Sequence, residues 1–208
     1  MLRYFMQVVG RSKERRFWNW FTRNEGRLFQ FEADQDAIFA DLGSQLRTVH
    51  PDLVFEFGPV LGDGKRDFVV SADGLLRVFP AVESLVAEAP ALERWSWVKF
   101  RQRGKPHVEM SFADIAVNFD TACYAMLPRG DHVDVTILFE SYNEDSRPLY
   151  EQIAFLILDH LLGEFDVVTR VAQVDVAPSS ADLTQCKPLS DLPAEFDAYM
   201  AKQRKSYH

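Results

Sequence analysis

Cysteine is scarce in this sequence. The 208 residues include two cysteines, Cys123 and Cys186, which lie far apart along the chain. Neither has a second cysteine or a histidine at the spacing of a zinc site or a redox motif. We therefore interpret both as reduced thiols of a cytosolic protein, and we predict no bound metal and no cofactor.

Long hydrophobic runs are also missing. No stretch approaches the roughly 20 apolar residues that a membrane-spanning helix needs. The apolar run Tyr4–Val9 is too short for the core of a signal peptide, and Gly10 and charged residues follow it instead of a cleavage site. These absences predict a cytoplasmic protein with no membrane partner.

Signatures of known catalytic sites are absent as well. The chain has no G-x-S-x-G, no H-E-x-x-H and no cysteine with a base at fixed spacing. Residues 58–65 resemble a phosphate-binding loop, but one residue too many separates Gly58 from Gly64, and Arg66 replaces the expected Ser or Thr. We therefore assign no catalytic residue, and we consider an enzyme the less favoured class.

An excess of positive over negative charge is found at the N-terminal end of the sequence. The net charge is −8, yet residues 1–27 carry seven Arg or Lys against two Glu. The remainder of the chain is therefore strongly acidic. An acidic body argues against nucleic acid as a partner.

The most informative stretch runs from Pro148 to Val176. Apolar residues at helical spacing predict a mostly buried helix over 149–162, begun by Pro148 and ended by Gly163. Residues 165–176 then have apolar side chains at both odd and even positions. That pattern predicts a strand in the interior of a sheet.

Aromatic residues cluster in a predicted helix over 12–24, which Ser12 can cap. Its stripe consists of Phe17, Trp18, Trp20 and Phe21. We favour a helix that docks these rings on the acidic body or on a second subunit, which would make a homodimer. The alternative is a basic aromatic arm that stacks on bases or lies on a membrane surface.

The remaining elements alternate between strands and helices. Helices are expected at 34–50, 80–89 and 190–200, and strands at 53–57, 67–71, 95–100, 107–110, 115–119, 121–127 and 133–140. No internal repeat is visible. The order predicts an α+β fold: a mainly antiparallel sheet with helices on one face, in a split βαβ (ferredoxin-like) arrangement with extra strands and N-terminal helices. We expect a single domain over 1–208, made of an N-terminal helical segment (1–50), an α+β core (51–176) and a loop with a C-terminal helix (177–208).

Residues 53–101 carry a resemblance to a family. The matching pieces are Phe55-Glu56-Phe57-Gly58-Pro59, Ser71-Ala72-Asp73-Gly74, Phe79-Pro80 with Leu85, Ala89-Pro90 with Leu92, Trp95 and Phe100-Arg101, and later Gly163-Glu164 with Asp166. Together they resemble a set of uncharacterised bacterial cytosolic proteins of about 200 residues. That family carries no assigned activity, so the resemblance implies no catalytic residues. Gln102 stands where the family pattern has a proline.

A candidate ligand-binding surface follows from the strand over 95–100. Alternate positions would place Lys99, Arg101 and Arg103 in a cationic row beside Trp95 and Trp97. Such a row could bind a phosphate, a carboxylate or an acidic protein loop. The competing interpretation is a strand end with solvated charges. Glu56 would be either exposed to solvent or a partner of Arg101.

A second cluster of polar residues surrounds the end of the buried helix. Asp159, His160, Glu164 and Asp166 could bind a divalent metal or share acid–base work. Neighbouring positions on a helix diverge by about 100°, so the spacing is poor for either role. We favour a structural role for this cluster.

Two classes of function remain open. The first is a cytosolic binding or protein-interaction module that uses the surface around Trp95, Trp97, Arg101, Arg103 and Glu56. The alternative is an enzyme acting on a small anionic substrate, with Arg101 and Arg103 as clamps and Glu56 or His107 as the acid or base. A pocket that joins arginine, tryptophan and carboxylate would favour the enzyme.

Overall fold

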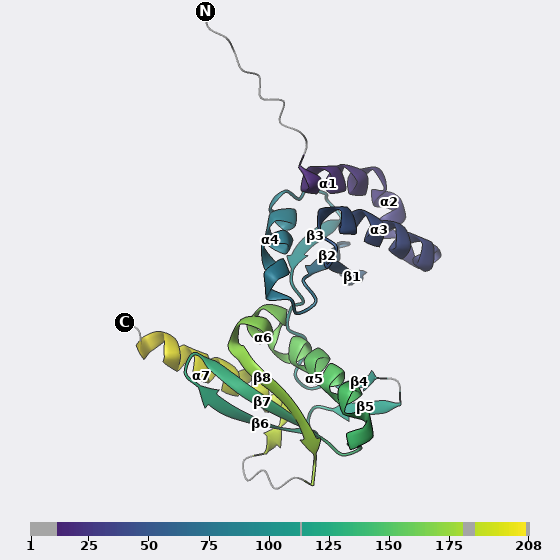
Figure 1. The fold of residues 1–208 in the computed structure, drawn as a ribbon. Helices are drawn as coiled ribbons and strands as arrows, with labels where there is room; N and C mark the ends of the chain where they lie inside the picture. The colour runs from purple at the N-terminus through teal and green to yellow at the C-terminus, as the bar shows by residue number, and fades with distance from the viewer. Residues whose placement is uncertain (1–11, 113, 181–185, 207–208) are drawn as a thin grey trace, which may run out of the picture. The chain divides into compact units, whose positions relative to one another are not determined.

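The computed structural model describes residues 12–112, 114–180 and 186–206. The chain forms two compact units, Met1–Lys99 and Phe100–His208 (Figure 1), where the sequence predicts one domain. Each unit contains its own sheet and its own helices, and the fold is α+β as predicted. No helix in the described ranges is long and apolar enough to cross a membrane. The apolar run Tyr4–Val9 lies outside the described residues.

The sheet of the first unit has three strands in the order β1-β2-β3. The strands β1 (Val54–Val60) and β2 (Arg66–Ser71) form an antiparallel hairpin, and β3 (Trp95–Lys99) runs parallel to β2. The helix α4 (Phe79–Ala87) connects β2 to β3 and has Pro80 in its first turn. A short 3-10 turn, η2 (Leu76–Val78), precedes it.

The N-terminal helices of the first unit are α1 (Lys13–Arg23), α2 (Glu25–Phe29) and α3 (Gln35–Val49), with a 3-10 turn η1 (Phe31–Ala33) between the last two. Ser12 caps α1 as predicted, since its hydroxyl accepts a hydrogen bond of 3.1 Å from the Arg15 N–H. The rings of Phe17 and Phe21 pack on Phe68 of β2 at centroid distances of 6.4 and 5.1 Å.

This packing changes the interpretation of the aromatic stripe. Phe17, Trp18 and Phe21 are buried within their own unit, and Trp20 is half-buried. The three buried rings therefore dock on the body of their own chain, one of the two positions that the sequence suggested, and the homodimer stays a prediction. The first unit has its own sheet to cover, and these rings supply the hydrophobic face that covers it.

The second unit contains a four-stranded sheet in the order β8-β7-β6-β9 and a separate two-stranded hairpin of β4 and β5. The bounds of these strands are β4 Glu109–Phe112, β5 Ile115–Asn118, β6 Cys123–Arg129, β7 His132–Phe139, β8 Val171–Pro178 and β9 Lys187–Pro188. The strands predicted over 121–127 and 133–140 are confirmed and form a hairpin, because β6 and β7 pair antiparallel up to Arg129 and His132.

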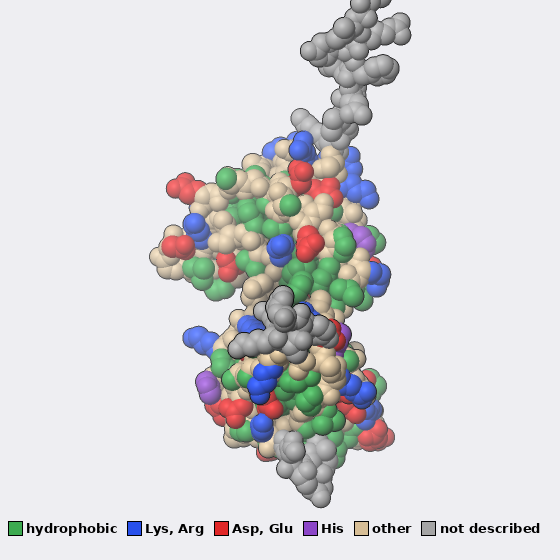
Figure 2. Space-filling view, turned by 90° about the vertical axis from the view of Figure 1, so that its left-hand side faces the viewer, with side chains coloured by type: hydrophobic (Ala, Val, Ile, Leu, Met, Phe, Trp, Pro, Cys, Tyr) green, Lys and Arg blue, Asp and Glu red, His purple; other side chains and the backbone are tan. Residues whose placement is uncertain are grey.

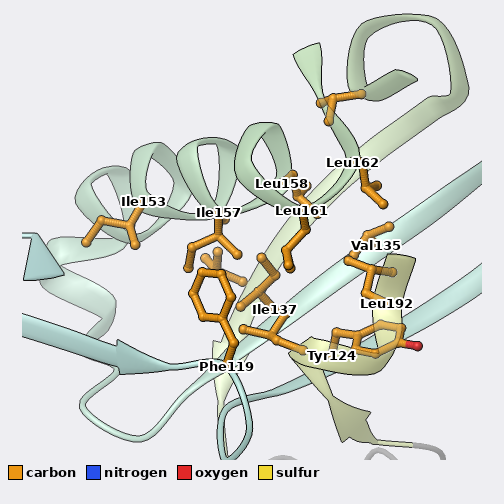
Figure 3. Close-up of a cluster of buried hydrophobic side chains, with 14 of the residues drawn as sticks. Phe119, Tyr124, Val135, Ile137, Ile153, Ile157, Leu158, Leu161, Leu162 and Leu192 are labelled. Carbon is orange, nitrogen blue, oxygen red and sulfur yellow. The ribbon is translucent and has the colours of Figure 1, made fainter. Parts of the chain in front are cut away.

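The core of the second unit lies between one face of this sheet and the helices α5 (Arg147–Leu162) and α7 (Leu192–Ser206), as Figure 3 shows. From α5, Ile153, Ile157 and Leu161 are at most 2% exposed. They meet β7 residues such as Ile137, and α7 adds Leu192 and Phe196. The buried helix predicted over 149–162 is therefore confirmed.

The strand predicted over 165–176 is wrong in its first half, and its second half lies at the edge of the sheet and not in its interior. Gly163 ends α5 with a φ of 80°, a backbone conformation that glycine adopts without strain. The chain then forms a second helix, α6 (Glu164–Arg170), and β8 starts only at Val171. The β-branched residues of this stretch suggest a strand by propensity, but the burial of Val167 against the core favours the helix.

The split βαβ arrangement is not what the topology shows. The parallel strands β7 and β8 are direct neighbours, and so are β2 and β3, so no strand separates either pair. Both units instead contain the same motif. An antiparallel hairpin is followed by a 3-10 turn, by a helix with proline in its first turn, and later by a strand that runs parallel to the second strand of the hairpin. In the second unit the 3-10 turn is η3 (Glu144–Ser146). Sequence inspection alone does not reveal this repeat.

Candidate functional site

The predicted tryptophans Trp95 and Trp97 lie together on β3 of the first unit. Their rings are parallel within 2° at a centroid distance of 5.9 Å, because alternate residues of a strand share one face. That face is covered by α1: Trp97 lies 4.6 Å from Trp18, and Trp95 lies 5.1 Å from Phe21. The face of the sheet that carries both tryptophans is therefore covered by a helix and not open to solvent.

Hydrogen bonds fix these rings in place. The Nε1–H of Trp97 donates to the Pro90 carbonyl at 2.7 Å, and that of Trp18 donates to the Leu85 carbonyl at 2.7 Å. The Nε1–H of Trp95 donates to Glu25 at 2.9 Å. A buried indole N–H without a hydrogen-bond acceptor would destabilise the fold. These three hydrogen bonds satisfy the N–H groups and hold each ring in a defined orientation.

The edges of Trp95 and Trp97 line a shallow, open hollow of about 810 Å³, which we call the Trp97 hollow. The segment that follows α4 supplies most of the other lining residues. The other lining residues are Lys65, Ala89, Pro90, Ala91, Leu92 and Glu93. Trp95 is only 4% exposed, whereas Trp97 is half-buried and so reaches solvent.

A smaller hollow of about 260 Å³ shares Pro90 with the first. Trp18 and the ion pair between Arg15 and Glu88, at 2.8 Å, line it. Charges of both signs therefore surround the two hollows. Figure 2 shows the same mixture of acidic and basic side chains over the visible face of each unit.

The structure places the five predicted site residues in different positions. Trp95 and Trp97 share the site just described. Glu56 belongs to the same sheet but is exposed, on the face opposite Phe55 and Phe57. Arg101 and Arg103 belong to the second unit.

Arg101 contacts the acidic cluster that the sequence placed at the end of α5. Its guanidinium lies 3.4 Å from the Asp159 carboxylate. Its backbone N–H donates to the Glu164 carboxylate at 3.0 Å, and its carbonyl accepts from the Glu164 N–H at 3.0 Å. Glu164 is fully buried.

Arg103 makes a still larger set of contacts. Its Nε–H donates to the Leu162 carbonyl at 2.7 Å, and its terminal nitrogens reach Asp197 at 2.9 Å and Asp166 at 2.7 Å. Burial opposes the charge on this guanidinium, but the hydrogen bonds that it donates to Asp197 and Asp166 outweigh burial and raise the pKa of Arg103. The basic and acidic clusters that the sequence suggested separately therefore neutralise each other.

The neighbouring histidines also have structural partners. The ring of His160 lies against Gly104, and its Nε2 is 2.9 Å from the Lys105 carbonyl. His107 pairs with Asp120 at 2.7 Å, and this contact lowers the pKa of Asp120. Within the described ranges, no group of His, Cys, Asp or Glu is arranged to hold a metal ion, so the metal alternative for Asp159, His160, Glu164 and Asp166 receives no support.

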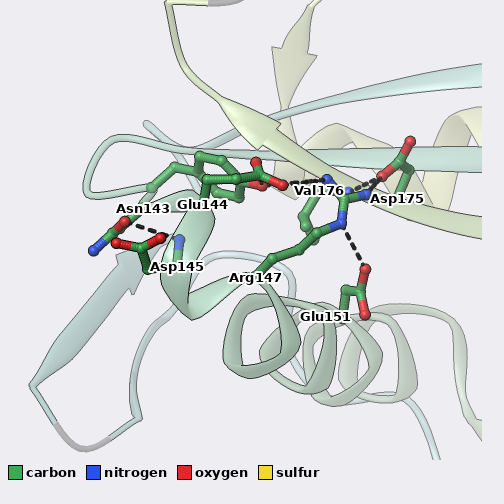
Figure 4. A network of polar contacts seen from close by, with 8 residues as sticks. Asn143, Glu144, Asp145, Arg147, Glu151, Asp175 and Val176 are labelled. Carbon is green, nitrogen blue, oxygen red and sulfur yellow. Dashed lines mark hydrogen bonds and ion pairs between the residues drawn. The ribbon is translucent and has the colours of Figure 1, made fainter.

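Another polar network surrounds Arg147 at the start of α5 (Figure 4). Its guanidinium donates to Glu151 at 2.9 Å and also to Asp175 of β8. The hydrogen bond with Tyr142, followed by those with Glu151 and Asp175, raises the pKa of Arg147. This network connects the first turn of α5 to β8, and we interpret it as structural.

Arg66 is the residue that sequence analysis missed. Its side chain is 5% exposed and its guanidinium lies 4.6 Å from the centre of the Phe31 ring and 5.4 Å from that of Phe29. One nitrogen pairs with Glu32 at 2.6 Å, and the other two have no hydrogen-bond partner among the residues that the structure describes. The ring faces stabilise this buried cation. In the sequence, Arg66 lies between a glycine-rich loop and a strand, and that position does not indicate that its side chain is buried.

Comparisons with known proteins add no relative: no family model, no curated protein and no solved structure matches this chain. The functional argument therefore depends on the geometry of the two units.

Proposed function

We propose that this protein is a binding module whose contact surface is the Trp97 hollow of the first unit. The occupant we propose is a short extended peptide segment that contains proline or other apolar residues. The observation that carries the proposal is the half-buried ring of Trp97, held by its hydrogen bond to Pro90 and lining a hollow of about 810 Å³.

The shape of the hollow favours a peptide over a small metabolite. Compact ligands are usually bound in clefts that cover most of their surface, whereas this hollow is shallow and open. Extended proline-rich segments bind to aromatic-lined grooves, where the preformed backbone loses little conformational freedom. A rigid tryptophan beside Pro90 and Leu92 supplies a surface of that kind.

The charges around the hollow also favour a peptide over a small anion. Lys65 and Glu93 give its lining one charge of each sign, so an anion gains little from it. The arginines expected to clamp an anionic substrate contact carboxylates instead, Arg101 at Asp159 and Arg103 at Asp166 and Asp197. These contacts weigh against the alternative of an enzyme acting on a small anion.

The family resemblance fits the same proposal. Four of the residues that carry it, Ala89, Pro90, Leu92 and Trp95, line the Trp97 hollow. If the resemblance reflects common descent, we expect the related proteins to share this surface.

Calorimetric titration with an alternating alanine–proline peptide tests the proposal, with a glycine–serine peptide of equal length as the control ligand. Ala91 is exposed and lines the hollow, so Ala91→Glu places a charge there without removing a core side chain. Ala40→Glu is the matched control, because Ala40 is also exposed, lies on α3 of the same unit and does not line the hollow.

We expect saturable binding of the alanine–proline peptide and a loss of about tenfold in affinity in Ala91→Glu, since an added charge has to be desolvated or displaced. Ala40→Glu is expected to bind as the wild type does. Absence of binding to the wild type, or equal affinity in the wild type and Ala91→Glu, would overturn the proposal.

A further inference from the structure

The two cysteines, distant in sequence, meet in the second unit. In the antiparallel pairing of β6 with β9, Cys123 lies opposite Pro188 and Tyr124 opposite Lys187. Continuing this register by one residue places Cys186 beside Ala125. Since side chains alternate along a strand, Cys186 and Cys123 then lie on the same side of the sheet as diagonal neighbours.

Both cysteines are free; Cys186 is exposed and Cys123 is half-buried. Burial, together with a hydrogen bond that the Cys123 thiol donates to Cys186, raises the pKa of Cys123 to about 11. The two thiols are thus close enough to interact directly, which the sequence interpretation of two independent thiols did not anticipate.

We propose that Cys123 and Cys186 form a reversible disulfide when the protein meets a small-molecule disulfide such as oxidised glutathione. This modification site lies in the second unit and is independent of the Trp97 hollow.

The exchange proceeds in two steps. The thiolate of Cys186, the exposed partner, attacks one sulfur of glutathione disulfide, whose S–S bond breaks, and the departing glutathione thiolate takes up a proton. Cys123 then loses its proton to solvent and attacks the sulfur of Cys186, which releases the second glutathione as a thiol. The two protein sulfurs are oxidised by two electrons, and glutathione disulfide is reduced to two thiols.

The order of attack follows from exposure and acidity. Thiol–disulfide exchange requires an accessible thiolate, and Cys186 is the exposed member of the pair. The half-buried Cys123, with its raised pKa, serves as the resolving thiol.

The disulfide would affect β9 and the helix that follows it in the sequence. The strand β9 consists of Lys187 and Pro188 only, and it leads through the 3-10 turn η4 (Leu189–Asp191) directly into α7. A disulfide at Cys186 would anchor this edge strand, and with it the start of α7, covalently to β6. A bond between diagonal neighbours at an exposed edge departs from favoured disulfide geometry, so we expect it to be easily reduced.

Equilibration of the full chain in mixtures of oxidised and reduced glutathione tests this proposal. After alkylation of the remaining thiols, intact mass and peptide mapping are expected to show the chain two hydrogen atoms lighter, with the Cys123 and Cys186 peptides linked. Excess reduced glutathione should reverse the change. We also expect oxidation to raise the Tm by roughly 5 °C, because the cross-link restricts the unfolded chain.

The variants Cys123→Ser and Cys186→Ser provide the controls. Each retains one thiol, so oxidation should give at most one mixed disulfide with glutathione and no rise in Tm. A wild-type chain that ends with glutathione on both cysteines, or on Cys186 with Cys123 still free, would overturn the proposal.

Discussion

The carboxylate of Glu164 accepts a hydrogen bond from the backbone N–H of Arg101, while the N–H of Glu164 donates to the carbonyl of Arg101, both at 3.0 Å. This reciprocal pair joins the segment that follows β3 to the start of α6. This contact gives both residues a structural role.

Loss of the Glu164 carboxylate should destabilise the second unit. Glu164→Ala leaves the buried N–H of Arg101 without its acceptor and opens a cavity, so we expect the free energy of unfolding to fall by about 2–4 kcal/mol. Glu164→Gln keeps an acceptor and should lose less. Urea denaturation followed by circular dichroism measures both. The matched control is Asp166→Ala, a partly exposed partner of Arg103, which should cost at most ~1 kcal/mol. Equal effects of Glu164→Ala and Asp166→Ala would contradict this interpretation.

A side chain at Gly104 should collide with His160. An added Cβ would lie 2.0 Å from His160 Cε1, so the imidazole has to leave its position beside the Lys105 carbonyl. We expect Gly104→Ala to cost about 1–2 kcal/mol of unfolding free energy.

A double-mutant cycle isolates this contact. In a His160→Ala background the Gly104→Ala change should cost little, because the obstructing ring is gone. Gly26→Ala is the matched control, since an added Cβ meets nothing within 4 Å there and the position is helical. A Gly104→Ala cost that persists without the His160 ring would show that the backbone, not the ring, requires glycine.

The aromatic core of the first unit should be sensitive to truncation. Phe21 is fully buried between Phe68 and Trp95, so Phe21→Ala is expected to lower the free energy of unfolding by about 3–5 kcal/mol. Trp20→Ala, at a half-buried position of the same helix, should lower it less. All four tryptophans lie in the first unit, so tryptophan fluorescence during denaturation reports on this unit alone. If Phe21→Ala is as stable as the wild type, α1 does not contribute to the core of the first unit.

Stability at acid pH should depend on Glu195. Burial alone would raise its pKa, but hydrogen bonds from Lys187, at 2.8 Å, and from Tyr124 reverse the shift and lower it. A carboxyl group with a lowered pKa in the folded state stabilises the protein above its ordinary pKa near 4.5, and this contribution is lost as the pH falls through the lowered value. Unfolding of the second unit should therefore become easier below about pH 4.5. Glu195→Gln should show a weaker pH dependence there, and an identical profile would contradict the assignment.

The sequence predicted the regular elements better than their environment. Helical spacing identified α5, and alternation identified β7, because each has one strongly apolar face. The same rules failed over Glu164–Arg170, where β-branched residues form a helix for reasons of packing. They also could not show that the protein has two cores, since the aromatic stripe of α1 has the same pattern whether it covers a sheet or another subunit.

The candidate site was predictable only in part. Trp95 and Trp97 were recognised as a pair by their alternation, and the structure keeps them together at the Trp97 hollow. The partners of Arg101 and Arg103 were not predictable, because Asp159, Glu164 and Asp166 lie about 60 residues away along the chain and approach only through folding. Arg66 shows the same limit, since its burial depends on rings contributed by another segment.

The indole N–H signals in a nitrogen-labelled sample show whether the Trp97 hollow is a peptide-binding surface. On addition of the alanine–proline peptide, we expect concentration-dependent shifts of the Trp97 and Trp95 signals, no shift of the Trp20 signal, and loss of the response in Ala91→Glu. Signals of Trp97 and Trp95 that stay unchanged at saturating peptide would contradict this proposal.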